Sequence, residues 1–229
     1  MSNIAATATC LDGLFGATVH ELAGDANALE AAHRRADELK HVGRHAYVVG
    51  AGGSSPIGCL GYVACAAEIL AQEEQLGLEF ARIVVPNGSS GTHAGLAAGL
   101  SAAAKEVRRV QSFAVLAPAE RAREATLALA RATLAQLCPA TMGADDIVVH
   151  GHQLGAGYGL PTQAMFDAVR TVARTEGLLL DPVYSGKAFA GLLDMVRSGC
   201  FQAGQAVLFI MTGGTPGLFA YRPAFEEAD

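Results

Sequence analysis

The feature that most constrains the fold of this sequence is a regular alternation of short apolar runs with longer segments of helical periodicity. The segment RIVVP at 82–86 is almost continuously apolar, as strands are when both of their faces are covered. Such runs alternate with Ala-rich segments of helical spacing, which predicts parallel βαβ units in a layered α/β fold. We expect strands at 18–23, 45–50, 82–86, 110–118, 146–150 and 206–214, and helices at 28–43, 57–77, 92–107, 119–137, 161–177 and 185–199.

The composition is that of a globular chain. Of its 229 residues 51% are hydrophobic and 17% charged, which is enough apolar material for one large core or two small ones. The formal net charge of −6 comes without a basic stripe, which argues against nucleic acid as a partner. No stretch of ~18 apolar residues is uninterrupted, so we expect no transmembrane helix and no membrane partner. The first residues also lack the pattern of a signal peptide.

Cysteine usage indicates a reducing compartment. The cysteines are widely spaced and none forms a CxxC pair, so we interpret them as reduced thiols of a cytoplasmic protein. His150 and His152 alternate along the chain, but nothing nearby completes a metal-binding set, and we predict no metal site. The five cysteines are Cys10, Cys59, Cys65, Cys138 and Cys200.

Glycine-rich loops follow three of the apolar runs, at 50–58, 87–95 and 212–217. In a parallel α/β sheet, ligands bind outside the carboxyl ends of the strands, where such loops lie. The loop NGSSGTHAG at 87–95 opens a helix, so its glycines, hydroxyls and free backbone amides would suit a phosphate. It lacks the GK[ST] ending of a nucleotide-binding P-loop, which favours the monophosphate of a cofactor. The alternative is a tight strand–helix turn whose polar groups only cap the helix.

Three further side chains lie at expected ligand-facing ends. Thr212 comes at the end of the last strand, where its hydroxyl could meet a ring nitrogen or satisfy its own turn. Tyr158 lies in a glycine loop just before a helix, and Tyr184 precedes another helix. A tyrosine in such a turn is more often a packing residue, but two of them at these ends favour a functional role.

Five segments in this order resemble the D-cysteine desulfhydrase and 1-aminocyclopropane-1-carboxylate (ACC) deaminase family, which uses pyridoxal phosphate. The resemblance covers roughly residues 12 to 223 and implies the tryptophan synthase β-like fold (fold type II), a parallel sheet flanked by helices. It implies a larger cofactor-binding domain at 51–229 and an incomplete smaller α/β domain at 1–50. The matching segments are VVGAGGSSPIGCLGYVACAAEI, NGSSGTHAGLAAGL, GYGLP, EGLLLDPVYSGKAFAGLLDMV and TGGTPGLFAY.

The resemblance also implies roles for individual residues. Thr212 would face the pyridine nitrogen, Tyr184 would lie near the reacting carbons and Tyr158 near the substrate. Ser185, where the deaminase branch tends to carry Glu, favours the desulfhydrase branch and is counted among the cofactor contacts. The phosphate would be held by Gly88, Ser89, Ser90, Gly91 and Thr92.

The sequence departs from the family in its lysines. The family's cofactor-bearing lysine lies in an NKxRK-like motif upstream of the matching segments, as does a Ser-Asn pair that handles the substrate, so we expect a chain truncated at its N-terminus. The lysines here are Lys40, Lys105 and Lys187, and only Lys187 is a candidate substitute, since a catalytic amine must be desolvated and aimed at the cofactor. The incomplete domain should expose apolar faces, which predicts a homodimer or a missing segment or partner chain.

The function implied is α,β-elimination from a small sulfur amino acid, of the D-cysteine desulfhydrase type, which gives pyruvate, ammonia and sulfide. One alternative is deamination of ACC. A second is a non-catalytic family member that binds pyridoxal phosphate or another phosphate, or serves as a partner subunit. A third is a scaffold fragment whose loops are only turns.

Overall fold

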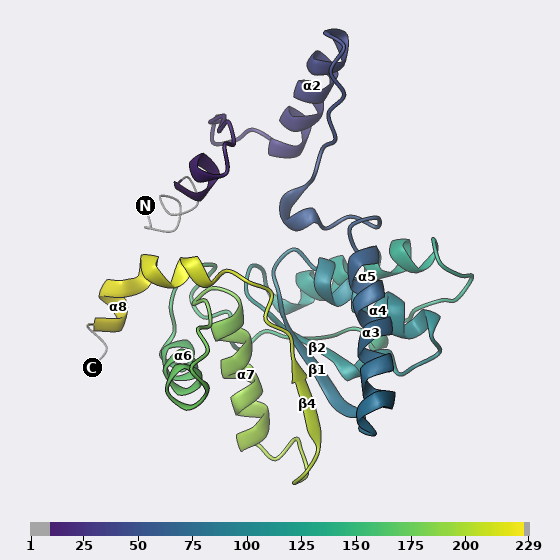
Figure 1. Cartoon of the computed structure of the whole chain (residues 1–229), viewed down its shortest axis with the longest axis vertical. Coiled ribbons are helices and arrows are strands. Elements are labelled where there is room, and N and C mark those ends of the chain that lie inside the picture. The colour runs from purple at the N-terminus through teal and green to yellow at the C-terminus, as the bar shows by residue number, and fades with distance from the viewer. Residues whose placement is uncertain (1–9, 227–229) are drawn as a thin grey trace. The chain divides into compact units, whose positions relative to one another are not determined.

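The computed structural model describes residues 10–226 and divides into two units, Met1–Gly53 and Ser54–Asp229, each of which is described by itself. The second unit contains a four-stranded sheet of order β3-β2-β1-β4 in which every pairing is parallel (Figure 1). The central strand places Ile83 beside Val110 of one neighbour and Leu208 of the other. A parallel sheet flanked by helices was expected from the sequence and is confirmed. The strands are β1 (Phe80–Asn87), β2 (Val110–Ala114), β3 (Val148–His150) and β4 (Ala206–Phe209).

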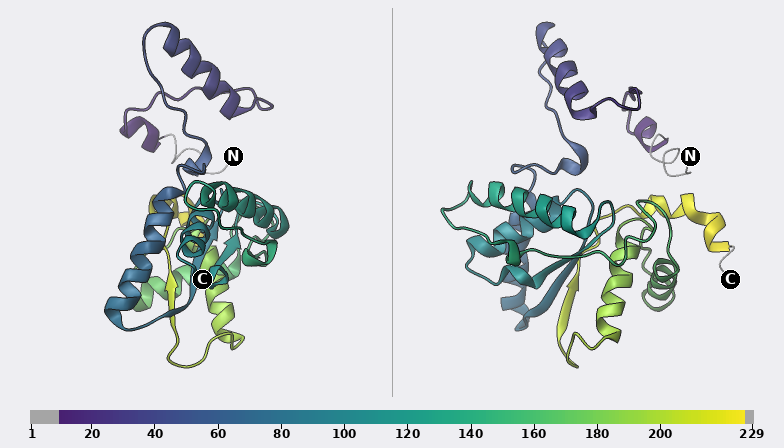
Figure 2. Two further views of the ribbon diagram at one scale, coloured as in Figure 1. Left: turned by 90° about the vertical axis from the view of Figure 1, so that its right-hand side faces the viewer. Right: turned by 180° about the vertical axis from the view of Figure 1, so that it is seen from behind.

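Helices cover both faces of this sheet, with α3, α4 and α5 on one side and α6 and α7 on the other (Figures 1 and 2). Successive side chains of β1 point to opposite faces: Ile83 packs with Leu96 of α4, whereas Val84 packs with Leu192 of α7. This two-sided burial explains why β1 is an apolar run without alternation. The helices of this unit are α3 (Leu60–Leu76), α4 (Gly91–Ala102), α5 (Ala119–Leu134), α6 (Gln163–Glu176), α7 (Ser185–Arg197) and α8 (Arg222–Glu226).

Local signals set the ends of several helices. The hydroxyl of Thr162 accepts a hydrogen bond from the backbone N–H of Met165 at 3.2 Å and caps the start of α6. Gly77 and Gly177 end α3 and α6 with φ of 63° and 69°, in the left-handed region that glycine adopts at no steric cost. The helices predicted at 57–77 and 161–177 are therefore confirmed to within a few residues. Single-turn 3₁₀ helices lie at Ala51–Gly53, Val107–Arg109 and Ala144–Asp146, and a longer one at Thr215–Tyr221.

The first unit contains the helix α2 (Ala28–His41), which begins at the capping side chain of Asn27. The strands predicted at 18–23 and 45–50 are wrong, because neither segment has regular structure here. A strand is stabilised by hydrogen bonds to a neighbour, and in the described part of this unit neither segment pairs with another. Apolar alternation alone therefore did not suffice to form a sheet.

Within residues 10–226 no helix is both long and apolar enough to cross a membrane.

Candidate active site

The loop between β1 and α4 presents backbone amides at the start of a helix. Its last residue, Ser90, is the N-cap of α4, has a left-handed φ of 71° and makes no side-chain capping hydrogen bond. The first N–H groups of a helix have no acceptor within it and lie at the positive end of its dipole. The amides of Gly91 and Thr92 can therefore receive an anion.

A buried amide side chain holds this loop in place. Asn87, the last residue of β1, donates through Nδ2 to the hydroxyls of Ser112 and Thr126, at 3.0 Å each. Its Oδ1 accepts from the hydroxyl of Ser90 at 3.3 Å, so that hydroxyl is turned toward the protein interior. Ser89 is exposed instead, and its Oγ accepts from Ser54 Oγ at 2.7 Å. The structure thus separates Ser90, which supports the loop, from Ser89 and Thr92 on its more accessible side.

Two glycines of the loop are required by close contacts. A Cβ at Gly91 would lie 2.5 Å from Ser54 Oγ, and one at Gly88 would lie 2.9 Å from Cε1 of the Tyr184 ring. Both distances are too short for a real side chain. Ser54 therefore lies directly against the backbone of Gly91, and the Tyr184 ring lies directly against Gly88.

Tyr184 also contacts the second tyrosine predicted from the sequence. The hydroxyl oxygens of Tyr184 and Tyr158 are 2.6 Å apart, and their rings meet edge to face with centroids 6.0 Å apart. Burial, followed by the hydrogen bond to Tyr158, raises the pKa of Tyr184 well above its ordinary value. Tyr184 therefore keeps its proton at neutral pH, beside the more exposed Tyr158.

A buried carboxylate that the sequence analysis did not single out positions Tyr184. Asp181 accepts hydrogen bonds of 2.7–2.9 Å from the backbone N–H groups of Val183, Tyr184 and Ser185, and one of 2.6 Å from Ser185 Oγ. It thus caps α7 and fixes the backbone of Tyr184. An aspartate a few residues before a helix is a known start signal and could have pointed to this role.

The same aspartate lies between two other predicted site residues. Ser185 is buried with its hydroxyl directed at Asp181. Gly214, with φ of +88°, packs so closely that a Cβ there would lie 3.1 Å from Cγ of Asp181. Thr212, two residues earlier, is exposed in the loop after β4, at the carboxyl end of the sheet. The structure places Tyr184 and Tyr158 beside the loop that contains Gly88. Asp181 connects these residues to the loop that contains Thr212.

The candidate substitute lysine is fully buried. Lys187 donates through Nζ to the carbonyl oxygens of Leu154 at 2.7 Å and Gly157 at 3.1 Å. Burial lowers its pKa. Lys40 is exposed on α2, and Lys105 is exposed just after the end of α4.

One buried histidine follows the phosphate loop. His93 in the first turn of α4 is 1% exposed, and its Nδ1 lies 2.7 Å from Ser112 Oγ. Burial, with a smaller contribution from His150, lowers the pKa of His93 to about 3, so the ring is neutral. Its Nε2 has no hydrogen-bond partner within the described chain.

These groups fit a cofactor phosphate. The uncapped helix start and the accessible hydroxyls of Ser89 and Thr92 form a cradle without a lysine. The hydroxyls of Tyr184 and Tyr158 meet each other beside this cradle.

Residues 7–213 match a protein family described as "Pyridoxal-phosphate dependent enzyme". The D-cysteine desulfhydrase of Serratia proteamaculans (strain 568) is 41% identical over 192 residues, which are 82% of this chain and 56% of that protein. The D-cysteine desulfhydrase of Salmonella typhi is 42% identical over 189 residues, with the same coverage. The chain therefore spans little more than half the length of these curated relatives.

Solved structures show the same fold. A crystal structure of an ACC deaminase homologue superposes with a TM-score of 0.83 and 35% identity, covering 96% of this chain and 66% of that one. A pyridoxal 5'-phosphate-dependent aspartate racemase superposes with a TM-score of 0.53 at 14% identity, covering 88% of this chain and 61% of that one, a likeness of fold alone.

Proposed function

The chain belongs to the family of pyridoxal-phosphate dependent enzymes, as the resemblance of its five segments implied, and from this membership we propose that it is part of a lyase of the D-cysteine desulfhydrase type. The observation that carries the proposal is the contact of Tyr184 with both Gly88 of the phosphate cradle and the hydroxyl of Tyr158. Identities of 41% and 42% to D-cysteine desulfhydrases support the choice of reaction.

The proposed reaction converts cysteine and water to pyruvate, ammonia and hydrogen sulfide. Bound pyridoxal phosphate supplies an electron sink for the charge that develops at the substrate Cα. The amides of Gly91 and Thr92 and the hydroxyl of Ser89 would hold its phosphate, and Thr212 would meet the ring nitrogen. A neutral hydroxyl at that position suits elimination, because it leaves the ring nitrogen less firmly protonated than a carboxylate would.

The tyrosine pair would act on the substrate side. Tyr184 keeps its proton because its pKa is raised, so it can donate a hydrogen bond but is a poor base. Tyr158, 45% exposed, is the member of the pair that a substrate can reach. In the proposal Tyr184 orients the Tyr158 hydroxyl, and Tyr158 contacts the substrate.

The first experiment measures cofactor binding by the chain itself. We would titrate it with pyridoxal phosphate, follow visible absorption and equilibrium dialysis, and compete with inorganic phosphate. Thr92→Val should weaken binding, whereas Thr175→Val, an exposed threonine on α6, should not. Binding that phosphate does not displace, or that is equal in both variants, would contradict the cradle.

Turnover decides between the candidate activities. Sulfide release from D-cysteine would support the desulfhydrase assignment. Ammonia release from ACC without sulfide release from D-cysteine would support the deaminase alternative. The similarity to the ACC deaminase homologue favours that alternative. Cofactor binding without either product supports the non-catalytic alternative. Borohydride reduction followed by mass spectrometry would show whether any of Lys40, Lys105 and Lys187 carries the cofactor.

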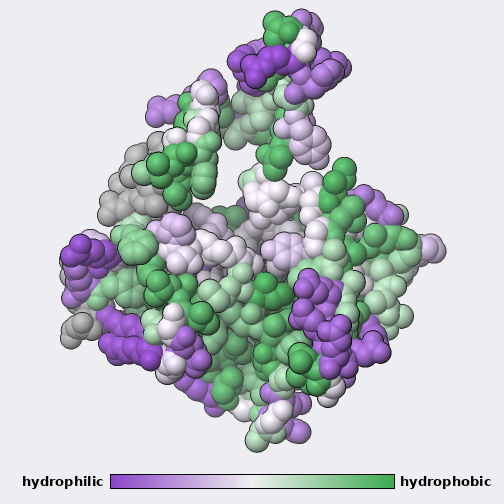
Figure 3. All heavy atoms as spheres, viewed as in Figure 1, coloured by the Kyte–Doolittle hydropathy of each residue, from purple (hydrophilic) through white to green (hydrophobic). Residues whose placement is uncertain are grey.

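We also propose that the chain is homodimeric, with an additional segment or partner chain as the alternative. Large apolar side chains are exposed in the first unit, among them Phe15, Tyr47 and Val49 at 83%, 76% and 67%. In the second unit, hydrophobic residues reach the surface where the edge strand β4 lies (Figure 3). Sedimentation equilibrium over a range of concentrations tests this, and a monomer at all of them would contradict the dimer.

Cytoplasmic location is a further part of the proposal. All five cysteines are free thiols in the structure, which suits a reducing compartment. Fractionation of cells that produce the protein would test it.

A further inference from the structure

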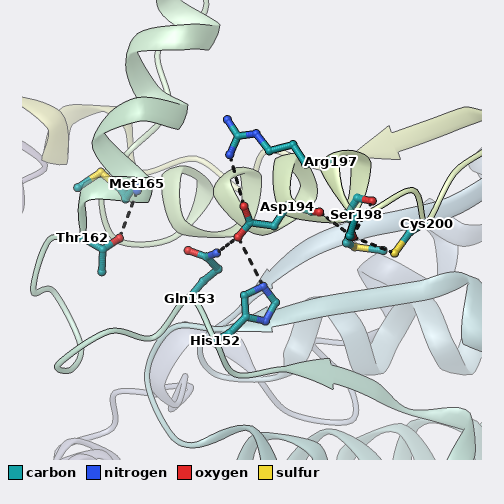
Figure 4. A network of polar contacts seen from close by, with 9 residues as sticks. His152, Gln153, Thr162, Met165, Asp194, Arg197, Ser198 and Cys200 are labelled. Atoms are coloured by element: carbon teal, nitrogen blue, oxygen red, sulfur yellow. Dashed lines mark hydrogen bonds and ion pairs between the residues drawn. The ribbon is translucent and has the colours of Figure 1, made fainter.

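Helix α7 carries two polar side chains that bind the segment before α6. Lys187 and Asp194 lie about two helical turns apart and so project from the same face. Lys187 binds the carbonyl oxygens of Leu154 and Gly157. Asp194 Oδ2 accepts from Gln153 Nε2 at 2.6 Å, as Figure 4 shows from close by. One helix face therefore holds the segment 153–157 at three points.

The burial of Lys187 requires an explanation. Its side chain is 0% exposed, and the groups that its ammonium binds are neutral carbonyl oxygens. Taking an ammonium out of water is costly, and two carbonyl acceptors compensate only part of that cost. A methionine would fill the same space without this penalty. The amine instead provides hydrogen bonds to two backbone carbonyls, which an apolar side chain could not make.

The held segment leads directly to the tyrosine pair. Tyr158 follows Gly157, whose carbonyl Lys187 binds, and precedes Gly159, whose carbonyl accepts from the hydroxyl of Tyr221 at 2.5 Å. Tyr158 is thus fixed on both sides by contacts to the backbone rather than by burial of its own ring. Tyr184 lies three residues before Lys187 in the chain, and its hydroxyl meets that of Tyr158.

We propose that Lys187 is a positioning residue, which holds the carbonyls of Leu154 and Gly157 so that the Tyr158 hydroxyl stays against that of Tyr184. The importance of the pair for catalysis rests on the function proposed above, but the geometric role does not. The same contacts argue against Lys187 as the cofactor-bearing lysine, because its amine would have to leave both carbonyls and its buried site.

The test uses the full chain and the alkaline titration of its tyrosines. The chain has five tyrosines and no tryptophan, so tyrosinate absorbance can be followed directly. Loss of the Tyr184 transition in Tyr184→Phe identifies that residue in the titration. The groups that raise its pKa besides burial are Tyr158 and Asp181, and both remain in Lys187→Met. If Lys187 acts through Tyr158, Lys187→Met lowers the Tyr184 midpoint toward the ordinary ~10.

Two comparisons separate positioning from a general structural role. Tyr158→Phe should lower the same midpoint, and the double variant with Lys187→Met should shift it no further, since both act on one contact. Lys105→Met, which removes an exposed lysine, should leave it unchanged. A midpoint unaltered in folded Lys187→Met, or additive shifts in the double variant, would overturn the proposal.

A second measurement uses the unaltered chain and so tests the buried contacts on which the proposal depends even where Lys187→Met does not fold. Trace acetylation followed by mass spectrometry should label Lys187 at least about tenfold more slowly than Lys40 and Lys105. The amine of Lys187 must leave its buried contacts before it can react. Equal rates would overturn the proposal. Neither measurement needs bound cofactor or turnover, so failure of the proposed function would leave both outcomes readable.

Discussion

The hydroxyl oxygens of Tyr158 and Tyr184 lie 2.6 Å apart although 26 positions separate the residues in the chain. The Tyr184 ring also contacts Gly88 at the end of the central strand, so a single side chain joins the phosphate cradle to the loop before α6. Asp181 holds the backbone of Tyr184, and Lys187 holds the loop of Tyr158.

Gly88→Ala should disturb the cradle and the tyrosine pair together. Its Cβ would lie 2.9 Å from the Tyr184 ring, which must then move. Overpacking of this kind costs about 1–3 kcal/mol, so we expect lower stability in urea and weaker binding of pyridoxal phosphate. Gly217→Ala is the matched control, because nothing lies within 4 Å of a Cβ at that position. Equal behaviour of the two variants would show that the close contact does not matter.

Asp181→Ala should destabilise the second unit. It removes the acceptor of three backbone N–H groups and one hydroxyl at the start of α7. Loss of a helix cap together with buried unsatisfied donors predicts a cost of about 3 kcal/mol in the free energy of unfolding. Asp145→Ala, at an exposed position, should change it by less than about 0.5 kcal/mol. Denaturant unfolding measures both, and similar small losses would rule out the capping role.

His93 should make the protein less stable in mild acid. Its pKa is about 3 in the folded chain, against an ordinary value near 6.5, so the unfolded state binds the proton first. The neutral ring of His93 contributes its full share of the free energy of unfolding above pH ~6.5, and this share is lost as the pH falls toward 3. Burial lowers the pKa of the neighbouring His150 as well, which acts in the same direction.

Unfolding measured between pH 7 and pH 4 tests this. His93→Leu should unfold more easily at pH 7, because it loses the contact with Ser112, yet its stability should fall less steeply toward pH 4. His33→Gln, at an exposed position, should keep the slope of the parent chain. An unchanged slope in His93→Leu would assign the acid sensitivity to other groups.

Glu73→Ala should be costly, because it removes the buried partner of a buried guanidinium. Glu73 pairs with Arg109 and accepts from the backbone N–H of Phe80 at 2.6 Å, and both side chains of the pair are buried. Removing one partner of such a pair typically costs about 3–5 kcal/mol. Glu79→Ala removes the second, 77% exposed partner of Arg109 and should cost less than about 1 kcal/mol. Thermal and urea unfolding would distinguish the two, and equal costs would contradict this account.

Much of the second unit was predictable from local patterns. The run at 82–86 became the core of β1, and the helix predicted at 185–199 is present at Ser185–Arg197. The predicted helix at 92–107 ends at Ala102 instead, and Ala104 turns with a positive φ of 53°. The loop 87–95, for which we propose phosphate binding, could be singled out because its signal, glycines and hydroxyls before a helix, lies in one short segment.

The supporting residues were not predictable in the same way. Asn87 and Lys187 act through partners that are distant in sequence, and no residue pattern identifies those partners. A lysine in a helix suggests a surface position, and only the packed structure shows its side chain buried against a loop. The strands predicted at 18–23 and 45–50 failed for a related reason, because a strand exists only where another backbone pairs with it.

In the second unit, the sequence by itself determined the order of strands and helices, the parallel α/β class and the place of the glycine-rich loop before α4. These follow from periodicity, capping and backbone freedom, which act between residues close along the chain. Only the tertiary structure decided that Tyr158 meets Tyr184, that His93 is neutral and that Lys187 faces inward. Hydrogen bonding and desolvation depend on which distant groups share a site, and that is fixed only when the helices pack on the sheet.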